Sequence, residues 1–141
     1  MRKLFVAVVA SCVLAAPVSA AENGGHVYKK AAAVNDLMEY MVKPAMDRIK
    51  VYREAGGPAN KDEWQKAFGA ISMVNEASQL ILMDGRAKDQ AWSEGAGKVI
   101  AASRDAMLGA YRMDLDGYSK GLKAMSGGCK TCHDVHKKDK K

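Results

Sequence analysis

Two cysteines and a histidine near the carboxyl end of the chain are spaced for chemistry. In the segment Cys129-Lys130-Thr131-Cys132-His133, two thiols stand three positions apart and an imidazole follows directly. On a helix these are positions i, i+3 and i+4, so all three side chains project from one face. Two such thiols can add to the two vinyl groups of one haem, and His133 can then be the proximal iron ligand. The motif predicts one covalently bound haem c, held by Cys129, Cys132 and His133.

The same side chains leave other chemistry open. A structural zinc ion takes four ligands, which His136, His26 or carboxylates could complete. A thioredoxin-like redox pair expects a βαβ pattern around its cysteines, and no strand pattern is visible. A disulfide in an exported protein normally joins distant segments, whereas these two cysteines would join almost nothing.

A sixth ligand to a haem iron must come from earlier in the chain. Eight residues follow His133, and none of them is methionine. Met125 lies two turns before His133 on the same predicted helix, so it cannot reach the opposite side of the ring. The remaining candidates are the methionines of the other helices: Met38, Met41, Met46, Met73, Met83 and Met107.

Helical periodicity runs through the whole chain after its first twenty residues. We expect helices over residues 27–53, from a cap at Asn60 to about Asp84, over 89–111 and over 115–136. Four amphipathic helices of this length, with short connections, predict an all-α, antiparallel up-down-up-down four-helix bundle with the haem near the C-terminal helix.

The last helix carries the most regular pattern. Its apolar and chemical positions recur at spacings of three and four, which predicts one buried seam: Leu115, Tyr118, Leu122, Met125, Cys129, Cys132 and His136. Gly127 and Gly128 are expected to let a bulky group approach the backbone. In the first helix, Pro44 cannot donate to the carbonyl of Tyr40, which predicts a bend there.

The first twenty residues form a predicted signal peptide. Arg2 and Lys3 precede an apolar run over 4–16, and Val18 and Ala20 occupy the −3 and −1 positions of a cleavage site. The alternative is a lipoprotein whose cleavage exposes Cys12. With the signal peptide removed, residues 21–141 are expected to form a single monohaem domain in the periplasm. No later stretch is apolar enough to span a membrane.

The net charge of +6 is concentrated at the two ends of the chain. The signal peptide holds two of these charges and the lysine-rich tail a net three, so the body carries about one. No basic stripe with interleaved aromatic residues is present, and nucleic acid is not an expected partner. The tail is interpreted as a solvated end, or alternatively as a docking patch for an acidic redox partner.

Together these residues resemble the class II c-type cytochromes, the cytochrome c prime family. The resemblance spans the mature chain and is most specific at CKTCHDVHKK, where a basic residue, Lys137, stands four positions after His133. The family usually has an aromatic residue directly before this basic residue, and His136 replaces it here. In the five-coordinate branch of that family, an arginine precedes an apolar distal residue by four positions. In the six-coordinate branch a methionine takes the distal position, commonly in a Leu-Met pair.

The chain has Leu37-Met38 and carries Val34 in place of that arginine, so the resemblance implies Met38 as the distal iron ligand, with Met41 as the fallback. It thereby implies a periplasmic electron-transfer cytochrome of the low-spin, His/Met-ligated branch, with other redox proteins as donor and acceptor. The alternative is a five-coordinate protein that binds nitric oxide or carbon monoxide. A non-haem metal bundle using His133 and His136, or a subunit of one dedicated complex, remain further alternatives. Nothing indicates an enzyme, and the sequence leaves a homodimer open.

Overall fold

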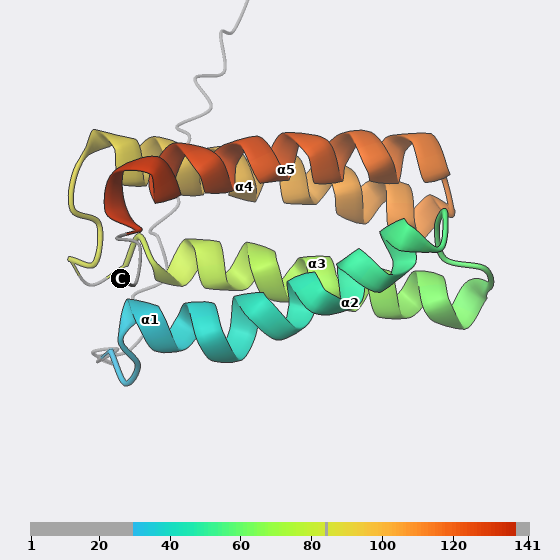
Figure 1. The fold of residues 1–141 in the computed structure, drawn as a ribbon, viewed down its shortest axis with the longest axis horizontal. Helices are drawn as coiled ribbons and strands as arrows, with labels where there is room; N and C mark the ends of the chain where they lie inside the picture. The colour runs from blue at the N-terminus through green and yellow to red at the C-terminus, as the bar shows by residue number, and fades with distance from the viewer. Residues whose placement is uncertain (1–29, 84, 138–141) are drawn as a thin grey trace, which may run out of the picture.

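Every regular element in the described part of the chain is helical (Figure 1). The computed structural model describes residues 30–83 and 85–137. Four helical segments follow one another, which is compatible with a helical bundle. The first consists of α1 (Val34–Leu37), the π-helical turn η1 (Met38–Val42) and α2 (Lys43–Glu54), and is followed by α3 (Lys61–Leu80), α4 (Gln90–Arg112) and α5 (Leu115–His136). None of these helices has both the length and the apolar character needed to cross a bilayer.

Side chains that cap the helices set where three of them begin. The predicted cap at Asn60 is confirmed: its side-chain oxygen accepts a hydrogen bond from the backbone N–H of Glu63 at 3.0 Å. The Glu63 carboxylate in turn accepts from the N–H of Ala59 at 2.7 Å, so the two residues satisfy backbone donors reciprocally. Asp89 caps α4 by accepting from the N–H of Trp92, and Asp114 caps α5 by accepting from the N–H groups of Asp116 and Gly117.

The first helical segment begins later than the sequence pattern predicts. Residues 30–33 are not helical, and α1 starts at Val34 after an extended Ala33. The Asp36 carboxylate accepts a hydrogen bond from the backbone N–H of Ala33 at 3.0 Å, which stabilises a helix start at that point. The predicted helix start at residue 27, His26, the signal peptide and Cys12 lie outside the described residues.

A π-helical turn directly precedes Pro44. Because the Pro44 nitrogen has no hydrogen, it cannot bond to the carbonyl of Tyr40. The N–H of Lys43 instead donates to the carbonyl of Met38, five residues earlier, which is the hydrogen bond of a π-helix. The irregularity expected from Pro44 therefore takes the form of a widened turn that carries both Met38 and Met41.

Two apolar clusters fill the interior. The larger one extends along α2, α3, α4 and α5 and includes Trp64 and Tyr118, whose rings meet edge to face at 5.4 Å. The smaller one gathers residues from α1, η1, the two ends of the α3–α4 connection and the end of α5. Tyr118, Leu122 and Met125 are buried as the seam predicts, but Leu115 is 46% exposed because it begins the helix and lies over Gly57.

Glycines allow α4 and α5 to pack closely. A Cβ on Gly121 would stand 2.4 Å from the backbone nitrogen of Ala106, and one on Gly128 would stand 2.8 Å from that of Val99. The close neighbour of Gly128 is thus helix α4, while the space beside Gly127 is open. The group that comes close to the backbone at Gly128 is therefore helix α4 itself.

Candidate functional site

The CKTCH motif lies in the last two turns of α5, as the sequence predicts. α5 begins at an Asp114 cap and ends at His136, with the carbonyl of His133 accepting from the N–H of Lys137 at 3.0 Å. Figure 1 shows this end of α5 at the same end of the molecule as α1. The helix therefore places the thiols and the imidazole near the start of the first helical segment.

The two thiols face inward and are half-buried. Cys129 packs against the larger apolar cluster, and Cys132 packs against the smaller one. Burial raises the pKa of both thiols above the ordinary value. Both are free thiols in the structure, so they are neutral and available to form thioether bonds.

His133 directly follows Cys132 on α5, and it is exposed, unlike the two half-buried cysteines. Partial burial of its ring lowers its pKa, the positive charge of Lys137 lowers it further, and Asp134 opposes this shift. Asp134 binds Lys130 instead, at 2.7 and 2.9 Å, and makes no hydrogen bond to His133. The neutral imidazole is thereby favoured, which is the form that binds a metal ion.

His136 has partners that sequence reasoning missed. Its Nε2 lies 3.1 Å from a carboxylate oxygen of Asp89, the residue that caps α4. Its ring meets the ring of Trp92 edge to face, with 5.1 Å between centroids. Trp92 is buried, and its indole N–H donates to the carbonyl of Ile81 at 2.9 Å. These contacts attach the end of α5 to the start of α4, and no local spacing links residues so far apart in the chain.

Met38 and Met41 belong to the same small apolar cluster as Cys132. Both methionines are half-buried, and the cluster also contains Trp92 and Leu37. The π-turn that carries them is the kind of helix irregularity often found at functional sites. The structure therefore gathers both predicted distal ligands and Cys132 of the CKTCH motif in one apolar cluster.

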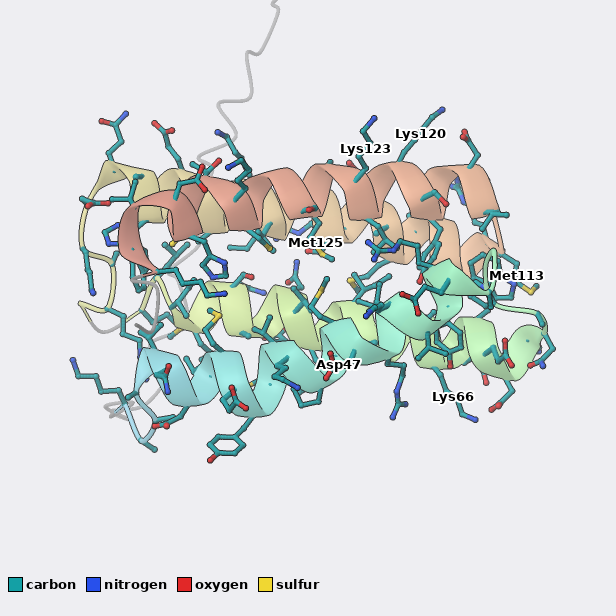
Figure 2. The ribbon with its side chains drawn as sticks, viewed as in Figure 1. Asp47, Lys66, Met113, Lys120, Lys123 and Met125 are labelled. Atoms are coloured by element: carbon teal, nitrogen blue, oxygen red, sulfur yellow. The ribbon has the colours of Figure 1, made fainter. Side chains whose placement is uncertain are left out.

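The other methionines are placed differently. Met46 and Met107 pack against the larger cluster, whereas Met73 and Met83 are exposed by 44% and 45%. Met125 is buried within the larger cluster, and Figure 2 shows it between α5 and the opposite helices. Met38 and Met41 share the smaller apolar cluster with Cys132, whereas Met46, Met107 and Met125 share the larger one with Cys129.

The residues at this end of the molecule fit a haem c. The donor set comprises two neutral thiols, a neutral imidazole and two thioethers, which are the groups that attach and ligate haem iron. α5 packs closely against α4, and η1 packs closely against α3. Between α5 and η1 the described chain has only this apolar cluster, without close backbone packing. Flexible methionine side chains can rearrange there to admit a flat apolar group.

A zinc site of the kind considered from the sequence is not preformed. Within residues 30–83 and 85–137, no three His, Cys, Asp or Glu side chains converge as a metal-binding group. His133 is exposed at the margin of α5, while His136 faces Asp89 and Trp92. The two histidines thus point to different surroundings, and a shared metal ion would require the end of α5 to rearrange.

Comparison of the chain with models of known families, with curated proteins and with solved structures finds no match.

Proposed function

We propose that this chain is a monohaem c-type cytochrome that carries single electrons between larger redox proteins in the periplasm. The observation that carries the proposal is the gathering of the CKTCH motif and two methionines at one end of an all-helical chain. In this proposal Cys129 and Cys132 form the thioether bonds, His133 is the proximal ligand, and Met38 is the distal ligand with Met41 as the fallback. The helices form an up-down-up-down bundle with the haem beside α5.

When bound, the haem supplies one-electron chemistry, and the chain supplies the surroundings that adjust it. A neutral His133 is ready to bind iron without losing a proton. A thioether ligand stabilises ferrous iron, so a His/Met site has a higher reduction potential than a five-coordinate one. The buried cluster of Leu37, Trp92 and Ile81 excludes water from the distal side.

An electron carrier needs fixed ligation and no substrate pocket at the metal. The half-buried Met38 and Met41 favour a closed distal side, which supports transfer over catalysis. Export of the chain by a signal peptide over residues 1–20 would bring it to the compartment where haem c is attached. We propose no enzymatic activity, and we propose redox proteins as its partners.

Visible absorption of the exported protein, oxidised and reduced, with and without carbon monoxide, tests the proposal. We expect sharp low-spin bands in the reduced protein that carbon monoxide does not shift. Met38→Ala should give high-spin bands and bind carbon monoxide, while Met73→Ala, which alters an exposed methionine, should match the wild type. If Met41→Ala alone opens the site, Met41 is the ligand and the carrier function stands.

Two results would contradict this proposal. Broad high-spin bands in the wild-type protein that shift readily with carbon monoxide would favour a gas-binding protein. Absence of haem bands from cells competent to attach haem would exclude a cytochrome altogether.

A further inference from the structure

A cavity of about 480 Å³ lies between the end of α2 and the first part of α5. Arg53 and the glycines after α2 line one side, and Leu115, Tyr118, Leu122 and Ser126 of α5 line the other. The cavity therefore has apolar walls with polar groups at its edges. Its volume is within the range of sites for small organic groups.

This cavity lies on the face of α5 that also carries the haem-attachment motif. Leu115, Leu122, Ser126, Cys129 and His133 follow one another at spacings of seven, four, three and four, so they share one side of the helix. Ser126 precedes Cys129 by three residues, a rise of about 4.5 Å. Helical side chains tilt toward the N-terminus, so those of Cys129 and His133 lean toward the cavity.

The polar groups of the cavity have unused bonding capacity. The hydroxyl of Tyr118 is buried and has no hydrogen-bond partner among the described residues. The guanidinium of Arg53 likewise makes no hydrogen bond or ion pair with the part of the chain that the structure describes, while the Arg53 backbone carbonyl accepts from the N–H of Gly56 at 3.2 Å. Lys123 also lines the cavity, but Figure 2 shows it directed away from the bundle. A ligand with a carboxylate would complete the bonding of Arg53 and Tyr118.

We propose that this cavity receives the propionate edge of the haem, with Arg53 as the cation that pairs with a propionate. The inference rests on the proposed function. In haem c the thioether bonds lie on one edge of the macrocycle and the two propionates on the opposite edge. A macrocycle attached at Cys129 and Cys132 that extends along this face of α5 brings its carboxylates toward Arg53. A free amphiphilic carboxylate shares this chemistry, and the experiment below separates the two sources.

The test compares the midpoint potential of the haem-loaded protein with those of its variants by spectroelectrochemical titration. A cation beside a propionate stabilises ferrous iron by offsetting the negative charge. Arg53→Gln should therefore lower the potential, and the pH dependence of the potential should move to higher pH because the propionate loses its partner. Arg53→Lys keeps the charge and should stay close to the wild type.

Lys120→Gln is the matched control. Lys120 is a lysine of α5 that pairs with Asp116 at 2.7 Å, projects away from the bundle in Figure 2 and does not line the cavity. Its variant should leave the potential unchanged. Arg53→Gln with the same potential and the same pH dependence as Lys120→Gln would overturn the assignment of Arg53.

Calorimetric titration of the haem-loaded protein with laurate separates a haem propionate from a free carboxylate. No binding of laurate is expected, because the haem edge fills the cavity. Binding that depends on Arg53 would show that the cavity is open in the loaded protein and would overturn the proposal. A chain that carries no haem bands would overturn the proposed function and this inference together, whereas the two preceding results would overturn the inference alone.

Discussion

Replacing Gly121 with alanine is expected to destabilise the protein, because helix α4 leaves no room for a Cβ at this position. The added carbon would lie 2.4 Å from the backbone nitrogen of Ala106, and 2.6 Å from both its Cα and its Cβ. Two of these three atoms are backbone, so no side-chain rotation can relieve the clash. The two helices must instead move apart.

The expected change follows from two opposing effects. Overpacking a close contact costs about 3 kcal/mol at the upper end of its usual range. Alanine in place of glycine stabilises a helix interior by about 1 kcal/mol. The net loss in the free energy of unfolding is therefore about 2 kcal/mol. Gly127→Ala, on the same helix but with open space beside it, should gain the second effect alone and stabilise by about 0.5–1 kcal/mol.

Guanidinium denaturation followed by far-ultraviolet circular dichroism measures both variants and the wild type under the same conditions. The two denaturation midpoints should move in opposite directions from the wild type. If Gly121→Ala were as stable as Gly127→Ala, the close packing of α4 and α5 at this glycine would be refuted.

Three further predictions concern the caps and the titrating groups. Asn60→Ala should lower the free energy of unfolding by about 1 kcal/mol, measured by the same denaturation, because the N–H of Glu63 loses its acceptor. The N–H of Trp92 and the contact with His136 lower the pKa of Asp89 below 3.8. The stabilising contribution of Asp89 is therefore present above that pH and is lost as the pH falls through the folded-state pKa. In acid titrations followed by circular dichroism, Asp89→Asn should lose less stability below about pH 4 than the wild type. Burial raises the pKa of Tyr118 from 10.0 to about 12. The folded state therefore favours the neutral hydroxyl, and the stability of the protein falls as the pH rises between these values. Tyr118→Phe should lack that component of alkaline unfolding, and an unchanged alkaline midpoint would show that the tyrosine is not buried as described.

The sequence by itself determined the features that depend on neighbouring residues. The Asn60 cap and the span of α5 from Leu115 to His136 follow from hydrogen bonds and apolar spacing within a few turns, which a local pattern contains. The place of the CKTCH motif near the end of α5 is local in the same sense, because the apolar spacing that predicts this helix runs through both cysteines. Pro44 likewise marked an irregular turn, because its missing N–H acts on a residue four positions away.

Only the tertiary structure decided which distant residues meet. Asp89 and His136 are 47 positions apart and come together because α4 and α5 pack side by side. The same packing makes Val99 the close neighbour of Gly128. Six methionines were candidates because they lie on other helices than His133. The fold placed Met38 and Met41 in the cluster with Cys132 and Met46 and Met107 against the cluster with Cys129, and it left Met73 and Met83 exposed. Periodicity shows which face of a helix is buried, but the partner of that face is set by how all the helices fill one interior.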